Sequence, residues 1–308
     1  LNVFTGSNAT AVGSGAADSA TIATQLTAVG KDAAGSITEG LESTAIGKGA
    51  LASVTTGDYN TAVGSHALLS FTGSNATAIG TNAADAAGSQ TYLTAVGKDA
   101  LGSSTSGNSN TALGALSLAT TIDGASNTAV GTAALQSGDC ADNNTAVGAN
   151  ALVNFTGSDA TAVGSGALAL CDNGIQNTAV GKDALNANAS NNNVAVGYQA
   201  GLVVTGADNT IVGSEAGNAL TGSNATIVGA GAAGAATTAT YLTAVGMSAG
   251  KTLIDQGYNT FLGYNTGGLT IGAQNTFLGA QAGYYAGDVD DCVAIGYNAM
   301  LGASGVTN

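Results

Sequence analysis

One short motif recurs along the whole chain, and its period constrains the fold more than any other feature. The motif Asn-Thr-Ala-Val-Gly, or a close variant, occurs eighteen times, and its glycines are spaced 16 or 17 residues apart. These core glycines are Gly13, Gly30, Gly47, Gly64, Gly80, Gly97, Gly114, Gly131, Gly148, Gly164, Gly181, Gly197, Gly213, Gly229, Gly246, Gly263, Gly279 and Gly296. The period is too short for a pair of helices and fits one turn of a β-solenoid, which predicts an all-β stack of about eighteen coils.

Each coil can be numbered from its core glycine, with position −1 immediately before it. Position −1 is always Val, Ile or Leu, and position −3 is Thr except at Val194 and Val293. Position −2 is Ala in fourteen copies and a larger apolar residue in the other four. Thr and Val favour strands, whereas glycine every few residues costs a helix roughly 1 kcal/mol each. The motif therefore predicts a strand, and stacking at about 4.8 Å per coil predicts a rod roughly 80 Å long.

Neither face of this predicted strand carries a charge in any copy. Positions −3 and −1 share one face, while position −2 lies on the other. A strand with uncharged residues on both faces is typical of one that is buried on both sides. We therefore expect one face to fill the coil and the other to pack against sister chains around an axis.

The variable, polar stretch after position +3 is predicted to form the outer wall of the stack. Its sequence differs from coil to coil, as recognition of a ligand requires. We expect contacts with a surface receptor or matrix ligand in segments such as 69–72, 136–142 and 170–175. Ser104 and Asn173 are predicted to be outer residues that tolerate a charge better than Ala146 or Ala162.

Composition and charge narrow the function further. The chain has 48 glycines, no Trp and no Pro, and its net charge of −14 disfavours nucleic-acid binding. No apolar run approaches the ~20 residues of a membrane-spanning helix, so direct membrane insertion is not expected. Residues 1–308 are predicted to form a single continuous repeat array that begins and ends within a coil.

The repeat resembles two groups of known arrays. Its core is similar to the head repeats of YadA-like trimeric autotransporter adhesins. It is closer still to the Asn-Thr-Ala-Leu-Gly-type arrays of bacterial surface proteins and phage tail fibres, as in Asn193-Val-Ala-Val-Gly-Tyr-Gln-Ala-Gly and Asn275-Thr-Phe-Leu-Gly-Ala-Gln-Ala-Gly. The resemblance covers all eighteen coils. It implies a left-handed parallel β-roll, packed as a homotrimer that can also join end to end, on the outside of a cell or on a virion.

Several motifs invite a chemical interpretation. The run Gly229-Ala-Gly231-Ala-Ala-Gly234 matches the dinucleotide fingerprint, which requires a helix after the third glycine. Another core follows within one period instead, so no cofactor is expected. His66 is the chain's single histidine, and its counterparts in other coils are polar turn residues. No catalytic or metal-binding residue is therefore predicted, and we expect the protein not to be an enzyme.

The remaining candidates are charged and sulfur-bearing residues. Three Lys-Asp pairs follow core glycines and are interpreted as solvated turn residues: Lys31-Asp32, Lys98-Asp99 and Lys182-Asp183. Asp288, Asp290 and Asp291 form the densest acidic cluster, without the calcium-roll motif. Cys140, Cys171 and Cys292 occupy different positions in their coils, which favours free thiols over a bridge within the chain.

The leading hypothesis from the sequence is a structural or adhesive fibre segment. One alternative is an ice-binding solenoid that uses the regular Thr row at position −3. A weaker alternative is a polysaccharide-degrading tail spike, because no coil is longer than 17 residues and carboxylate sites on β-helices need longer loops.

Overall fold

The computed structural model describes residues 7–120, 123–136, 140–187, 189–253 and 257–302. Eighteen parallel strands of three residues each form a β-solenoid, and the described residues contain no helix. The chain divides into two compact units, Leu1–Ser158 and Asp159–Asn308. The prediction of an all-β parallel solenoid is confirmed. Among the described residues no helix is long and apolar enough to cross a membrane.

The strands coincide with positions −3 to −1 of the repeat. In the first unit they are β1 (Thr10–Val12), β2 (Thr27–Val29), β3 (Thr44–Ile46), β4 (Thr61–Val63), β5 (Thr77–Ile79), β6 (Thr94–Val96), β7 (Thr111–Leu113), β8 (Thr128–Val130) and β9 (Thr145–Val147). In the second unit they are β10 (Thr161–Val163), β11 (Thr178–Val180), β12 (Val194–Val196), β13 (Thr210–Val212), β14 (Thr226–Val228), β15 (Thr243–Val245), β16 (Thr260–Leu262), β17 (Thr276–Leu278) and β18 (Val293–Ile295).

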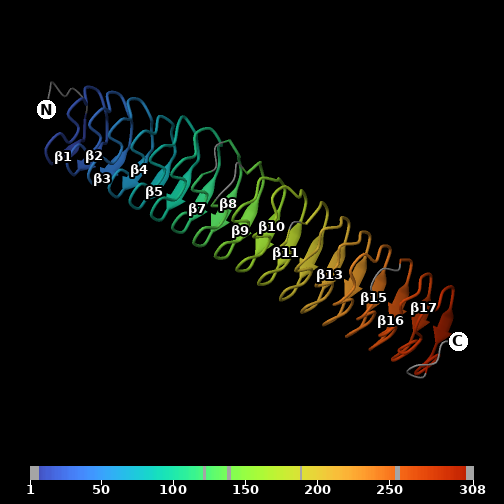
Figure 1. The fold of residues 1–308 in the computed structure, drawn as a ribbon. Helices are drawn as coiled ribbons and strands as arrows, with labels where there is room; N and C mark the ends of the chain where they lie inside the picture. The colour runs from blue at the N-terminus through green and yellow to red at the C-terminus, as the bar shows by residue number, and fades with distance from the viewer. Residues whose placement is uncertain (1–6, 121–122, 137–139, 188, 254–256, 303–308) are drawn as a thin grey trace. The chain divides into compact units, whose positions relative to one another are not determined.

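Successive strands of each unit pair in register, so every coil repeats the one before it (Figure 1). Thr44 pairs with Thr61 in the first unit, and Thr210 pairs with Thr226 in the second. Eight such pairings join β1 to β9 and eight join β10 to β18. The 16- or 17-residue period of the sequence is therefore one full turn of the solenoid.

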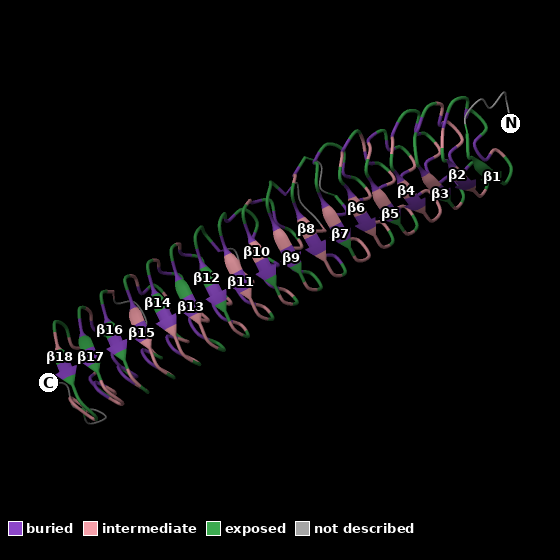
Figure 2. Cartoon of the chain, turned by 180° about the vertical axis from the view of Figure 1, so that it is seen from behind, coloured by how far each residue is buried: buried purple, intermediate pink, exposed green. Residues whose placement is uncertain are grey.

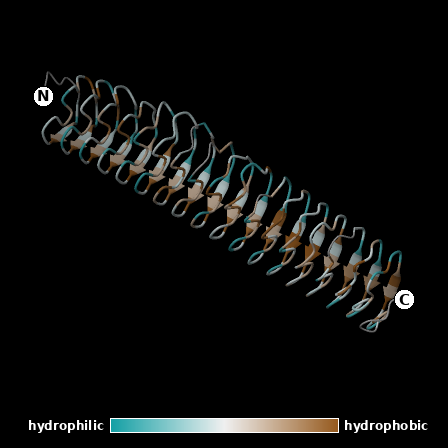
Figure 3. Cartoon of the chain, viewed as in Figure 1, coloured by the Kyte–Doolittle hydropathy of each residue, from teal (hydrophilic) through white to brown (hydrophobic). Residues whose placement is uncertain are grey.

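The two faces of each strand differ sharply in burial, and the pattern recurs from coil to coil (Figure 2). The middle residue of β2 to β18 is buried, as at Ala62 and Ala162. The residues at positions −3 and −1 face outward, and Leu113 is 47% exposed. The interior is thus lined by position −2, while the outward face is apolar and uncharged yet accessible within a single chain. Figure 3 shows the strands toward the hydrophobic end of the scale.

The core glycines are required by close approach between coils. All eighteen have positive φ, between 124° and 144°. A Cβ at Gly30 would lie 2.6 Å from the carbonyl oxygen of Gly47 in the next coil, which is closer than real Cβ atoms come. Glycine is therefore the residue that lets the chain leave the strand without separating the coils.

Three further corners of each coil are left-handed even where the residue is not glycine. In the coil of β4 they are Tyr59 (φ 57°), His66 (φ 60°) and Leu68 (φ 51°), at positions −5, +2 and +4. Their backbone N–H groups all donate to carbonyl oxygens of a neighbouring coil. These bonds along the stack offset the roughly 1–2 kcal/mol cost of each left-handed residue.

The prediction that the whole stretch after position +3 forms an outer wall is wrong. Position +7 points inward, and Phe71, Ser104 and Cys171 are all 0% exposed there. Ser104 accepts a hydrogen bond from the buried amide Nε2 of Gln90 at 2.7 Å. The polar appearance of the stretch comes from positions around this inward residue, such as Asp172 and Asn173, which are exposed.

Large and small residues compensate for each other inside single coils. Phe261 and Phe277 occupy position −2, and position +4 of the same coils is Gly267 or Gly283 instead of the usual Leu or Ala. A Cβ at Gly267 would lie 2.7 Å from Cε1 of Phe261. The two Phe rings stack with centroids 5.5 Å apart. In these two coils a large residue at position −2 is thus matched by a glycine at position +4.

Candidate functional site: the outward strand face

The outward face of the strands is the most regular surface of the protein. We call it the strand face, and it comprises positions −3 and −1 of β2 to β9 in the first unit and of β10 to β18 in the second. Thr and β-branched or Leu side chains form two parallel rows along it, one residue of each row per coil. No charged residue occurs in either row. Such a continuous uncharged strip is unusual on the surface of a monomeric soluble protein.

A buried ladder of Asn side chains fixes the spacing of the strand face. Position −4 carries most of these residues, and they are 0% exposed at Asn127, Asn193 and Asn209. The side-chain oxygen of Asn193 accepts from the N–H of Asn209 at 3.0 Å, and its Nδ2 donates to Gly206 at 2.9 Å. Because each of these amides ties its own coil to the next, the entry to the strand is held at a constant height in the nine coils that carry Asn at this position.

Exposed side chains border the strand face on both sides. Position −5 immediately precedes the buried Asn position and forms the leading edge of the face. Position +1 follows the core glycine and forms the trailing edge. Tyr241 and Tyr258 lie on the leading edge and stack with ring centroids 4.8 Å apart. The trailing edge includes Lys48, Met247 and Tyr264, all exposed.

The Lys-Asp pairs form salt bridges at the surface, in agreement with their interpretation as turn residues. The Lys31–Asp32 and Lys182–Asp183 distances are 3.7 Å and 3.6 Å. Lys98 donates a hydrogen bond to Asp99, which together with the amide of Asn82 holds the pKa of the Asp99 carboxyl below its usual range. Pairs as exposed as these add little to stability.

Asp85 and Asp99 have pKa values shifted in opposite directions. Burial raises the pKa of Asp85, and the nearby charge of Asp99 adds to that effect. Both carboxyls line an open depression of about 390 Å³ on the turns of the first unit.

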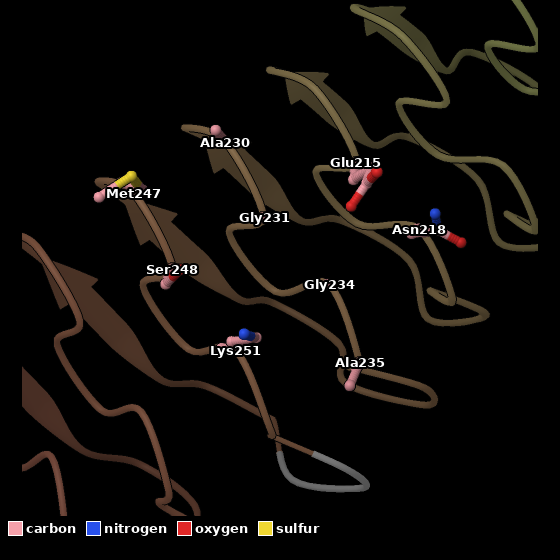
Figure 4. A pocket seen from close by; sticks show the side chains of 9 residues that line it. All are labelled: Glu215, Asn218, Ala230, Gly231, Gly234, Ala235, Met247, Ser248 and Lys251. Atoms are coloured by element: carbon pink, nitrogen blue, oxygen red, sulfur yellow. The ribbon is translucent and has the colours of Figure 1, made fainter.

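The glycine fingerprint produces a depression instead of a nucleotide site. Gly229 follows β14, and residues 230–236 then form the turn of the same coil, without a helix. Gly231 and Gly234 add no side chains to that turn. A depression of about 430 Å³ therefore lies between Glu215 and Lys251 (Figure 4). The helix amino terminus that would bind a pyrophosphate is absent from this described stretch.

The remaining candidate residues lie apart from one another. His66 is a half-buried corner residue with φ 60°. In the acidic cluster, Asp290 accepts a hydrogen bond from the N–H of Ala273 at 2.7 Å. No group of three or more metal-binding side chains occurs in the part of the chain that the structure describes.

The cysteines differ in their burial. Cys171 and Cys292 are free thiols, and Cys140 and Cys171 are buried. Burial raises the pKa of the Cys171 thiol, which lowers its reactivity. Cys292 takes the place of the ladder Asn at position −4 and is partly exposed.

Sequence comparisons add no relatives. No protein-family model matches the chain, and no curated protein matches it. The resemblance to YadA-like heads and tail-fibre arrays therefore stays a prediction carried by the repeat itself.

Proposed function

We propose that this chain is a structural and adhesive fibre segment displayed outside a cell or on a virion. In this proposal three copies pack around an axis lined by their strand faces. The observation that carries it is the accessible, uncharged strand face, whose Thr and Val rows repeat in every coil. Burying such a face between copies removes apolar surface from water without burying a charge.

The period of the face favours a copy of the same chain as its partner. One Thr (Val at 194 and 293) and one Val, Ile or Leu recur per coil, and the in-register pairing of the strands sets the spacing of the coils. A second copy placed in parallel has the same spacing and meets equivalent residues in every coil. A globular partner has no such repeat, so it would match only a few coils.

The exposed turn residues are the part of each coil that can differ without disturbing the stack. In the coil of β10 these include Leu170, Asp172, Asn173 and Ile175, whereas Cys171 between them is buried. Three copies around an axis would display three such turns at each level. Weak contacts with a receptor or matrix ligand would then add through multivalency.

Exchanging exposed turn residues tests the adhesive part of the proposal. Residues 170, 172, 173 and 175 would be replaced by their counterparts from the coil of β4, with Cys171 retained. We expect binding to cells or surfaces to change while β content and melting temperature stay the same. The matched control keeps residues 170, 172, 173 and 175 unchanged and replaces only Cys171 by Ser. If no exchange of exposed turns alters binding, the segment is a passive spacer.

An ice-binding function is the second candidate, because the structure faces the Thr row outward. Thr44, Thr61 and Thr77 are in register on neighbouring strands of a face without charges. This use of the face requires it to stay exposed to water, so it excludes packing between copies. A monomeric protein that produces thermal hysteresis would support this function over the fibre.

A further inference from the structure

One coil of the second unit has a turn without side chains at two positions that carry them elsewhere. Of the eighteen coils, the coil of β14 alone has glycine at both position +2 and position +5, at Gly231 and Gly234. Every other coil has a side chain at one or both of these positions. The depression of about 430 Å³ lies over this turn, and its lining comes from the coils of β13, β14 and β15.

Glycine at position +2 does not by itself leave such a space. Three other coils have a glycine there, and the residue at position +2 of the next coil covers it. A Cβ at Gly49 would lie 2.7 Å from Cδ2 of His66, and the other two covered pairs are Gly15 with Asp32 and Gly166 with Asp183. A Cβ at Gly231 would lie 3.8 Å from its nearest neighbour, Oγ of Ser248. Ser248 therefore leaves the surface of Gly231 open.

The coils on the two sides of this turn contribute opposite charges. Glu215 is at position +2 of the β13 coil and Lys251 is at position +5 of the β15 coil, and both exposed side chains line the depression (Figure 4). Neither forms an ion pair in the part of the chain that the structure describes. The other acidic residues at position +2 each follow a lysine and pair with it, whereas Ser214 precedes Glu215. Lysine occurs at position +5 in no other coil.

The spacing of these two charges indicates which ligand would satisfy both. The coils of β13 and β15 are two steps apart, and at about 4.8 Å per step this is roughly 10 Å along the stack. A bridging ligand needs a cation near Glu215 and an anion near Lys251 at about that separation. An extended peptide of three residues spans about 10 Å. Asn218 and Ser248 also line the depression, and their amide and hydroxyl groups can bind the polar backbone of such a ligand.

We propose that this depression binds short zwitterionic peptides, with the ligand's ammonium group at Glu215 and its carboxylate at Lys251. The glycine turn lets the backbone of the ligand lie directly against the coil of β14. The site uses no residue of the strand face, so it does not rest on the packing of copies. Ion pairs at exposed side chains are weak, so we expect a dissociation constant on the order of millimolar.

Triglycine is the probe for this site, because it has both charges at the required separation and no side chains. Added to the isotope-labelled full chain, it should give saturable shifts of the backbone amides of residues 230–236 and Ser248. Glycine, whose charges are too close together, and N-acetyl-triglycine amide, which has none, should give no saturable shift there. If triglycine gives none, or if the uncharged ligand binds as tightly, the proposal is wrong.

Reversing the two charges tests their roles in binding. Glu215→Lys and Lys251→Glu should each weaken triglycine binding by at least about fivefold, because each leaves two like charges around the depression. The double variant should bind as the wild type does, with triglycine turned end for end. Lys182→Gln, which removes a lysine from a salt bridge outside the depression, should leave binding unchanged. A double variant that binds as weakly as the single variants would contradict the assignment of the two charges.

Filling the turn tests the role of the glycine without changing the charge. Gly231→Asn introduces the residue that occupies this corner at Asn82 and Asn150, whose φ values of 54° and 57° are close to the 60° of Gly231. The variant should melt close to the wild type and lose most of its affinity for triglycine. A folded Gly231→Asn protein that binds triglycine as tightly as the wild type would show that the open turn is not part of a site.

Discussion

The glycine after each strand faces its counterpart in the next coil at very short range. Its backbone dihedral and this contact exclude a side chain independently of each other. Gly231 is different, because its φ is 60° and a Cβ there would lie 3.8 Å from Oγ of Ser248. Ala133 occupies the equivalent corner, with φ 56°. Gly231 is therefore replaceable, whereas Gly30 at the end of its strand is not.

Two alanine substitutions test this distinction. Gly30→Ala combines a strained φ with a Cβ 2.6 Å from the carbonyl oxygen of Gly47, so we expect a loss of more than about 3 kcal/mol in the free energy of unfolding. Gly231→Ala should cost about 1 kcal/mol. Denaturant unfolding monitored by circular dichroism measures both. Equal losses would show that close approach of the coils is not what selects the core glycine.

Within one coil, the strand and the turn that follows it share a fixed interior volume. The usual combination is Ala at position −2 with Leu or Ala at position +4, as at Ala95 and Leu101. In the coil of β16 the large residue, Phe261, is at position −2 and the small residue, Gly267, is at position +4. In the coil of β16 the strand and the turn are therefore packed against each other. The preceding coil takes part as well, because a Cβ at Gly250 would lie 3.0 Å from the Phe261 ring.

A pair of substitutions in the coil of β16 tests this exchange of volume. Phe261→Ala alone should cost about 3–5 kcal/mol because it leaves a cavity. Adding Gly267→Leu recreates the combination of the β6 coil and should recover most of that loss. Gly267→Leu alone should destabilise the protein, since a Cβ there already lies 2.7 Å from the Phe261 ring. Thermal melting of the three variants is the measurement, and additive losses would refute the compensation.

Much of the structure of one coil could be predicted from the sequence. The features that could not be predicted were hidden for physical reasons. The strand, its register and the sharing of one face by positions −3 and −1 follow from the spacing and alternation of the motif. The buried position +7 did not, because Phe71, Ser104 and Cys171 share no chemical character and each has a polar residue directly after it. The left-handed corners were missed as well, since residues such as Tyr59 and Leu68 rarely adopt positive φ and do so here through hydrogen bonds between coils.

At the scale of the whole molecule, each of the two units presents a strand face that its own chain leaves open. What the sequence could not settle was which face of the strand points outward. Both faces are uncharged, so the sequence does not show which of them is buried inside the coil.

The mass of the protein in solution tests the central claim most directly. Light scattering at micromolar concentration should give three times the chain mass of 29.1 kDa. Leu113→Glu on the strand face should lower this mass to that of one chain, because three carboxylates would be buried at the axis. Leu170→Glu, at a comparably exposed Leu on an outer turn, should leave the trimer intact. A wild-type protein that stays at 29.1 kDa would contradict the account.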